Sequence, residues 1–296
     1  MGFRETIWTL VVGGDIMLNA ISPSAKVFEG VAKPFQDATI AYANLEIPLT
    51  DAKAPTTRKT ATEVKNRTQF ILKAQPRHVD FLSAVGFDAF SLANNHAMDY
   101  RASGLNQMLG LLEKKEIVGF GAGSNWEAAR QCATLQVKDG PKVGLISFLG
   151  FNGASALRKC WPATTNSPGI ATLTITGVSD KQARKTIKAI VSKAKADCEF
   201  LVVCLHWGTE RQTQPTINQV RMGRMFIDEG ADVILGAHPH VLQPGELYKG
   251  KPIIYSLGNL ISPRPAQTAL YRLTFEGVQM SSAEILPAGI SGGKVK

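Results

Sequence analysis

The stretch VILGAHPHVLQ, Val233 to Gln243, passes from an apolar run into two histidines separated by one proline. The apolar run predicts a buried strand, and His238 and His240 follow its carboxyl end. Because a proline disfavours the helical region for the residue before it, we expect His238 to be extended. Side chains two residues apart in an extended chain point to the same side. The stretch therefore predicts two imidazoles that face one site, where each could hold one ion of a metal pair about 3.5–4 Å apart.

The rest of the chain alternates short apolar, β-branched runs with helical patterns. Continuous apolar strands between helices indicate α/β sheets that are covered on both faces. No interdomain linker is visible, so we expect a single domain over residues 1–296, with a C-terminal hairpin at 266–296 that completes the second sheet. Strands are expected at residues 6–12, 39–46, 88–93, 142–150, 199–207, 232–237 and 252–258, and helices near 75–85, 101–116, 124–130, 180–197 and 216–230.

Polar side chains follow five of the predicted strands at the point where each strand ends. Any one of them has an ordinary interpretation, such as a turn cap for Asp15 or a core histidine for His206. Five coincidences at the edge where α/β sheets bind ligands favour a shared polar site instead. Imidazole, carboxylate and amide donors together suit Mn, Fe or Zn. The side chains are Asp15; Asn44 and Glu46; Asn94, Asn95, His96 and Asp99; His206 and Glu210; and His238 and His240.

The charge of the chain favours anionic partners. Its 33 lysines and arginines against 24 acidic residues give a formal net charge of +9, which suits anionic small molecules or polymers. The lysine-rich segment Asp180 to Ala196 has its apolar residues on one helical face, so we interpret its lysines as solvated. No nucleic-acid motif accompanies them, and we expect no nucleic-acid partner.

Two polar stretches are long for connections in an α/β fold. The first, Thr50 to Gln69, carries five lysines and arginines and predicts either a functional loop that holds substrate anions or a disordered solvated loop. The second, residues 152–170, is expected to cover the site.

The cysteines and the N-terminus bear on the compartment. The four cysteines have no C-x-x-C spacing, and Cys198 and Cys204 are interpreted as small core residues of a strand. Neither a zinc cluster nor a disulfide framework is indicated, which suits a reducing compartment. The N-terminus lacks the pattern of a signal peptide, and no segment approaches the roughly 18 apolar residues of a membrane span. We therefore expect a cytoplasmic protein, or an outward-facing domain whose anchor has been removed.

Six blocks of this sequence, in this order, resemble the capsule and poly-γ-glutamate synthesis protein family of the CapA/PgsA type. That family belongs structurally with the calcineurin-like metallophosphoesterases. Pattern and resemblance together predict a four-layer α/β/β/α sandwich of two mixed sheets flanked by helices. The blocks are GGDIMLN, ANLEIPLT, SLANNHAMDYRASGL, LHWGTE, GAHPHVLQPGEL and IIYSLGNLI, spread over about residues 12 to 261.

The resemblance implies a site for one or two divalent metal ions. It places Asp15 as the carboxylate ligand of the first strand and Glu46 where a carboxylate bridges two metals. It makes Asn95 an amide ligand, and it gives His96 the role of contacting or protonating the leaving group. Asp15, Glu46 and His96 are then the candidate catalytic residues.

The histidines and one departure complete that implied site. His206 and His238 belong with one metal, and His240 with the other. The first motif of the superfamily is Asp-x-His, but Met17 stands at its histidine position, and a thioether is a poor ligand for Mn or Mg. The usual bridging aspartate is replaced by Glu46. One metal site therefore loses an imidazole.

Three functions remain open at this point. The first is a metal-dependent hydrolase that acts on a phosphoester or related anionic substrate, linked to capsule or poly-γ-glutamate metabolism. The second is a non-catalytic accessory factor that binds the anionic polymer. The third is an acid/base enzyme without metal that hydrolyses or epimerises a peptide-like substrate, with Asp15 or Glu46 and a histidine as the acid and base. The sequence predicts no oligomeric state.

Overall fold

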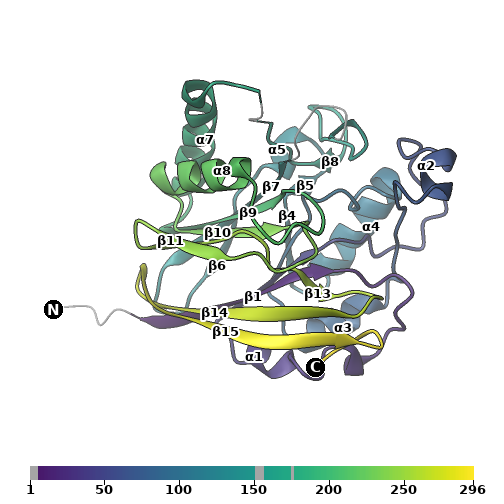
Figure 1. The fold of residues 1–296 in the computed structure, drawn as a ribbon, viewed down its shortest axis with the longest axis horizontal. Helices are drawn as coiled ribbons and strands as arrows, with labels where there is room; N and C mark the ends of the chain where they lie inside the picture. The colour runs from purple at the N-terminus through teal and green to yellow at the C-terminus, as the bar shows by residue number, and fades with distance from the viewer. Residues whose placement is uncertain (1–5, 151–156, 175–176) are drawn as a thin grey trace.

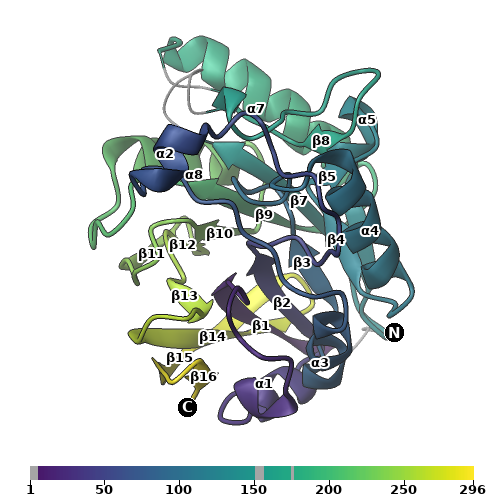
Figure 2. The ribbon, with the colours of Figure 1, turned by 90° about the vertical axis from the view of Figure 1, so that its right-hand side faces the viewer.

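Two mixed sheets lie face to face in the protein, and helices cover their outer surfaces (Figure 1). The computed structural model describes residues 6–150, 157–174 and 177–296. In Figure 2 the helices α7 (Asp180–Lys195) and α8 (Ile217–Asp228) lie above one sheet, and α1 (Ala32–Gln36) and α3 (His78–Val85) lie below the other. The predicted α/β/β/α sandwich is confirmed.

The first sheet has the strand order β16-β15-β14-β1-β2-β3-β4, and β13 also pairs with β1. Strands β1 to β4 are parallel, whereas β14 runs antiparallel to β1. The C-terminal hairpin therefore extends the sheet that contains the first strand; the single-domain organisation stays a prediction. The strands are β1 (Ile7–Ile16), β2 (Ile40–Leu45), β3 (Ala89–Ser91), β4 (Val118–Phe120), β13 (Asn259–Ile261), β14 (Ala266–Glu276), β15 (Gln279–Ser291) and β16 (Lys294–Val295).

The second sheet has the strand order β11-β12-β10-β9-β7-β6, and its central strands β7, β9, β10 and β12 are parallel. A small third sheet joins β5 (Ala122–Gly123) and β8 (Gly169–Ile170). The strands of the second sheet are β6 (Ala133–Gln136), β7 (Lys142–Gly150), β9 (Phe200–Trp207), β10 (Val233–Ala237), β11 (Gly245–Tyr248) and β12 (Lys251–Ile254).

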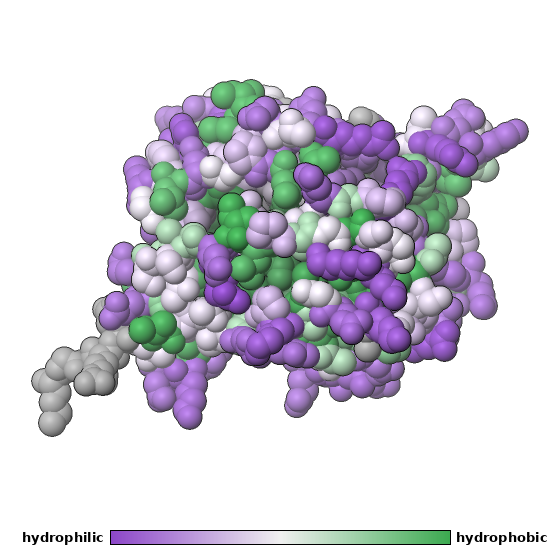
Figure 3. Space-filling view, turned by 60° about the horizontal axis from the view of Figure 1, so that its bottom comes forward, coloured by the Kyte–Doolittle hydropathy of each residue, from purple (hydrophilic) through white to green (hydrophobic). Residues whose placement is uncertain are grey.

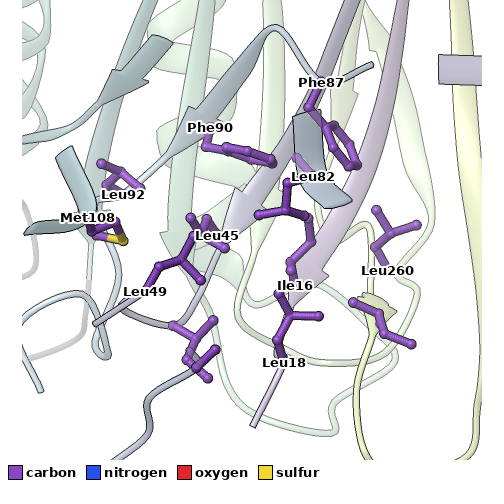
Figure 4. Packing of buried hydrophobic residues seen from close by; sticks show 14 of the residues in the cluster. Ile16, Leu18, Leu45, Leu49, Leu82, Phe87, Phe90, Leu92, Met108 and Leu260 are labelled. Atoms are coloured by element: carbon purple, nitrogen blue, oxygen red, sulfur yellow. The ribbon is translucent and has the colours of Figure 1, made fainter. Parts of the chain in front are cut away.

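Alternate residues of each central strand enter different apolar layers, as the two-residue period of a strand requires. On β1, Leu10 and Val12 enter the cluster between the sheets, while Val11 enters the cluster under the helices of the first sheet. On β9, Val202 lies between the sheets and Leu201 packs on the helix side. Three apolar layers thus hold four layers of structure together. Figure 4 shows part of the first helix-side layer, where Ile16, Leu45, Leu49, Leu82, Phe87 and Phe90 lie close together.

Several helices begin at a residue whose side chain caps them. In α7 the side chain of Ser179 accepts a hydrogen bond from the backbone N–H of Gln182, and the helix buries the apolar face predicted for it. Helix α8 begins in a capping box formed by Thr216 and Gln219. Among the described residues, no helix is long and apolar enough to cross a membrane. The others are η1 (Ala25–Val27), α2 (Ala61–Lys65), α4 (Arg101–Glu113) and α5 (Trp126–Ala129).

Two expectations from the sequence need correction. The strand predicted at residues 252–258 already ends at Ile254, because the chain then leaves the second sheet and pairs with β1 in the first sheet as β13. Gly258 makes that crossing with a φ of 64°. The alternative of a disordered loop at Thr50 to Gln69 is wrong, since the stretch contains α2, whose N-terminus has a capping box. Residues 152–156 of the second expected loop lie outside the described residues.

Large exposed apolar side chains are scattered over several elements, among them Ile7 of β1, Ile217 of α8 and Ile285 of β15. On the face seen in Figure 3, hydrophilic residues cover much of the surface and hydrophobic ones show between them near its middle. Single exposed apolar residues are normal for a globular protein. They indicate no particular partner.

Candidate metal centre

The carboxyl ends of five strands from both sheets bring the predicted polar residues together. In the first sheet Asp15 of β1 stands opposite Asn44 of β2, and in the second sheet Ala237 of β10 stands opposite His206 of β9. The first sheet supplies the carboxylates and amides, and the second supplies three histidines. The side chains gathered there are Asp15, Asn44, Glu46, Asn95, His96, His206, His238 and His240.

Glu46 lies at the centre of this cluster and is completely buried. Within the described part of the chain, neither of its carboxylate oxygens has a hydrogen-bond partner. Its Oε1 lies 3.5 Å from Nε2 of His206 and 3.8 Å from Nε2 of His240. Burial acts to raise the pKa of Glu46, but the charges of His240 and His206 outweigh it and the pKa is lowered. The carboxylate is therefore charged, and the groups nearest to its oxygens are the imidazoles of His206 and His240.

Asp15 is equally buried, but its oxygens are engaged. Oδ1 accepts a hydrogen bond of 2.8 Å from Nδ2 of Asn44, and Oδ2 accepts one of 3.1 Å from the backbone N–H of His238. Nδ1 of His240 lies 3.2 Å from the same Oδ2. Burial raises the pKa of Asp15, and repulsion from Glu46 raises it further. Burial and the neighbouring carboxylate thus act on Asp15 in the same direction, since two carboxylates that share a site resist ionising together.

His206 is oriented by two amides. Its Nδ1 lies 3.3 Å from Nδ2 of Asn44, which donates, and its Nε2 lies 2.7 Å from Oδ1 of Asn95. Because the amide nitrogen of Asn44 can only donate, Nδ1 accepts from it, and Nε2 carries the proton that is donated to Asn95. The predicted neighbours Asn95 and His206 are therefore in direct contact, although 111 residues separate them in the chain.

The turn of the His-Pro-His segment differs from the prediction. His238 has a φ of 97° and His240 a φ of 58°, so neither residue is extended. The local preference of a residue before proline is overridden by tertiary contacts, because the N–H of His238 bonds to Asp15 and Nδ1 of His240 lies 2.9 Å from Oδ1 of Asn259. Strained backbone of this kind persists where the surroundings hold it in place. The two rings still lie near each other, with centroids 5.7 Å apart.

The two histidines of that segment also differ electrostatically. Burial lowers the pKa of His238 well below its ordinary value, and the charge of His206 adds to the effect. Burial acts in the same direction on His240, but Glu46 and Asp15 outweigh it and raise its pKa to about 10. His238 is therefore a neutral imidazole, while His240 is charged when no cation competes for the carboxylates.

The possible donor atoms form two sets that share Glu46. One set joins Glu46 to Asp15 and His206, and the other joins Glu46 to His238 and His240; within each set the donor atoms lie within 4.8 Å of one another. This division of the histidines differs from the predicted one, which placed His206 with His238. The side chain of Met17 packs against the helix-side core.

His96 belongs to a second group of buried polar side chains beside the first. Its Nδ1 lies 2.6 Å from Oδ2 of Asp99, and Nζ of Lys59 lies 2.5 Å from Oδ1 of the same carboxylate. Lys59 also donates to the backbone carbonyl oxygens of Phe70 and Asn95, at 2.9 and 3.0 Å. The charge of His96 contributes to the low pKa of Glu46, so the two groups act on each other.

Sequence reasoning missed two members of this region. Lys59 looked like one of several basic residues of a polar stretch, and no local signal distinguishes it. Asn259, which orients His240, lies in the GNL of the last matching block, and its place just after a predicted strand was an available signal. Asn44 was recognised as a strand-end residue but not as the bridge between Asp15 and His206.

Similar solved structures define the class of fold. A novel phosphatase from Mycoplasma pneumoniae superposes with a TM-score of 0.59 at 14% identity, covering 96% of this chain and 94% of that one. A hypothetical protein from Thermus thermophilus gives the same TM-score at 13% identity, over 95% of this chain and 99% of that one. The protein has a metallophosphoesterase-like fold.

The family follows from the sequence itself. The model of the family described as bacterial capsule synthesis protein PGA_cap matches residues 9–264, and the chain belongs to that family. The PGA biosynthesis protein CapA of Bacillus subtilis is 31% identical over 255 residues, which are 84% of this chain and 61% of that protein. The capsule biosynthesis protein CapA of Bacillus anthracis is 29% identical over 76% of this chain and 53% of that protein. A probable polyglutamine synthesis accessory protein of Mycobacterium tuberculosis is 28% identical over 67% of this chain and 51% of that one. The chain thus spans between half and two thirds of the length of these relatives.

Proposed function

We propose that the protein is a metal-dependent hydrolase of a phosphoester or related anionic substrate, linked to capsule or poly-γ-glutamate metabolism. The observation that carries this proposal is Glu46, a fully buried carboxylate with no hydrogen bond to either oxygen among the described residues. A buried charge of this kind is costly unless it is paired or coordinates a metal. The imidazoles nearest to it lie 3.5 and 3.8 Å away, so they act on it through their charges.

The donor set fits a divalent transition metal. Asp15, Glu46 and His206 would hold one ion, with the amide oxygen of Asn95 beside them, and Glu46, His238 and His240 would hold a second. Imidazole with carboxylate and amide oxygen suits Mn, Fe or Zn. Bound there, such an ion would polarise a phosphoryl oxygen and lower the pKa of a bound water.

His96 is the candidate general acid. Its Nδ1 is held at 2.6 Å from Asp99, so the ring cannot turn freely and its Nε2 is left for other contacts. An imidazole positioned in this way can deliver a proton from Nε2 to the oxygen of the leaving group. Asp99 would keep the ring in the tautomer and orientation that this role requires.

The names of the relatives support a connection with an anionic polymer, and the net charge of +9 suits such a substrate. A non-catalytic polymer-binding role is the alternative. It predicts that poly-γ-glutamate is retained equally by the wild type and by a variant without metal, and that neither hydrolyses a phosphoester. A metal-free acid/base enzyme would instead act on a peptide-like substrate in the presence of a chelator.

The test uses protein purified without chelator and the matched variants Glu46→Gln and Glu210→Gln. Glu210 also follows a strand end but is exposed, so it controls for the substitution itself. We expect bound metal and Mn-stimulated hydrolysis of p-nitrophenyl phosphate in the wild type and in Glu210→Gln, and loss of both in Glu46→Gln. The proposal would be overturned if the wild type contained no metal and the substitution Glu46→Gln left its activity unchanged.

A further inference from the structure

Two cysteines lie on either side of a glycine in the second sheet, far from the donor sets in the fold. Gly144 of β7 pairs with Thr134 of β6 and with Leu201 of β9. Cys132 comes just before β6 and Cys198 just before β9. A Cβ at position 144 would overlap Sγ of Cys198 and would lie 2.8 Å from Sγ of Cys132. The missing side chain of Gly144 is therefore what allows the two sulfurs to approach each other.

The two thiols are chemically unequal. The hydrogen bond with Cys132 lowers the pKa of Cys198, although burial opposes it, and the charge of Lys195 acts in the same direction. The same hydrogen bond raises the pKa of Cys132. Sγ of Cys198 also lies 3.3 Å from the backbone oxygen of Ala194, which accepts from the thiol form. Because the thiolate is the nucleophilic form of cysteine, the lowered pKa favours Cys198 as the attacking member of the pair.

A cavity connects this pair to the surface. Cys132 is partly exposed and lines a cavity of about 800 Å³ between α5 and α7, together with Trp126, Arg130 and Phe148. These helices lie on the outer side of the second sheet (Figure 1). Cys198 is buried, at 9% exposure, and is not among the residues that line this cavity; Cys160 and Cys204 are buried more deeply, at 3% and 1%. A small reagent can therefore reach the pair from the side of Cys132.

We propose that Cys132 and Cys198 form a peroxide-reactive dithiol, oxidised to a disulfide by a small hydroperoxide that enters through this cavity. The Cys198 thiolate attacks a peroxide oxygen; an S–O bond forms, the O–O bond breaks, and the released hydroxide takes up a proton to give water. Sγ of Cys132 then attacks the sulfenic acid sulfur, so that an S–S bond forms, the S–O bond breaks and a second water leaves. Two thiols are oxidised and one peroxide is reduced to two waters.

Both cysteines stand outside the strands that follow them, on either side of β7. The N–H of Glu199, next to Cys198, donates a hydrogen bond of 3.0 Å to the backbone oxygen of Lys142. A disulfide requires the sulfurs to close to about 2.05 Å with the ordinary dihedral angle. Closure therefore has to draw the two segment ends toward each other across Gly144.

The test treats the full chain with a small excess of hydrogen peroxide, unfolds it and labels its remaining thiols. We expect the number of labelled thiols to fall from four to two, a mass loss of two hydrogen atoms, a cross-linked pair of peptides containing Cys132 and Cys198, and full reversal by dithiothreitol. Cys160→Ser is the matched control and should still form the disulfide. In Cys132→Ser the reaction should stop at a sulfenic acid on Cys198 that dimedone traps.

Gly144→Ala sharpens the test, since its Cβ would occupy the space between the sulfurs and should abolish the disulfide. Circular dichroism checks that this variant is folded, and the two serine variants carry the test if it is not. Four labelled thiols in the treated wild type, or a disulfide that maps to another pair, would show that the inference is wrong.

Discussion

Two buried carboxylates at the strand ends, Asp99 and Glu46, are treated in opposite ways by the fold. Asp99 is paired with Lys59 at 2.5 Å and His96 at 2.6 Å, and it accepts a hydrogen bond of 2.7 Å from the backbone N–H of Leu72. Glu46 is buried just as deeply, yet among the described residues neither of its oxygens has a hydrogen-bond partner. The fold therefore provides Asp99 with hydrogen bonds and ion pairs, whereas Glu46 interacts with its described neighbours mainly through their charges.

The difference teaches which carboxylate is structural. A buried charge that is paired and hydrogen-bonded holds its partners in place, and Asp99 holds His96 and the loop that carries Lys59. A buried charge without such bonds is the expected condition of a ligand position. Glu46 belongs to both donor sets, and it lacks the hydrogen bonds that the Asp99 carboxylate receives from the described residues.

The largest effect on stability is expected when Asp99 loses Lys59, its partner in a buried ion pair. Lys59→Met leaves Asp99 buried without its lysine, with only His96 and the N–H of Leu72 as partners among the described residues. Removing one member of a buried ion pair costs about 3–5 kcal/mol. Urea unfolding should show a loss of that size. Lys53→Met, an exposed lysine of the same loop, should change the free energy of unfolding by less than about 0.5 kcal/mol. Equal losses in the two variants would mean that the Lys59–Asp99 pair is not what stabilises this region.

The second effect concerns the imidazole that Asp99 orients, and it rests on the proposed function. His96→Asn should lower the rate of phosphoester hydrolysis by about 10²–10⁴-fold, because that is the usual contribution of a general acid. His96 is in neither donor set, so the metal content should stay at the wild-type level. The two measurements are the turnover number with p-nitrophenyl phosphate and the metal-to-protein ratio. A variant that loses its metal as well would place His96 among the ligands.

The strand ends could be predicted from the sequence because a buried parallel strand is a continuous apolar run. Once the runs at β1, β2, β3, β9 and β10 were recognised, their polar followers had to meet at one edge. Which of these polar side chains contact each other could not be predicted, since the contacts depend on how the two sheets face each other. The contact of Asn95 with His206 joins residues of different sheets.

Local rules failed where tertiary contacts decided the conformation. The rule for a residue before proline predicts an extended His238, but its N–H bond to Asp15 holds it at a positive φ. Lys59 could not be distinguished from its basic neighbours, because only the fold shows which lysine is buried. The helix around it was more accessible, as Thr60 and Glu63 have the spacing of a capping box.

A third effect tests the unsatisfied carboxylate directly. If Glu46 is a ligand, MnCl₂ should stabilise the wild type by about 2.7 kcal/mol at a hundredfold excess over the dissociation constant. Glu46→Gln should lose this response, whereas Asp99→Asn should keep it, despite its lower stability. Thermal unfolding of each variant with and without MnCl₂ gives the comparison. The same gain in Glu46→Gln and in the wild type would remove the distinction between the two carboxylates.

The smallest effect concerns the surface contacts around the loop that carries Lys59. Arg58 stacks on the ring of Trp161 with 3.9 Å between its Cζ and the ring centroid, and it donates a hydrogen bond of 2.8 Å to the backbone oxygen of Arg158. An exposed cation–π pair contributes about 0.5–1 kcal/mol. A double-mutant cycle of Arg58→Met and Trp161→Leu, followed by urea unfolding, should give a coupling energy in that range. A coupling energy as large as the loss in Lys59→Met would contradict this expectation. It would mean that the Arg58–Trp161 contact holds the loop in place, and that Lys59 is buried against Asp99 as a result.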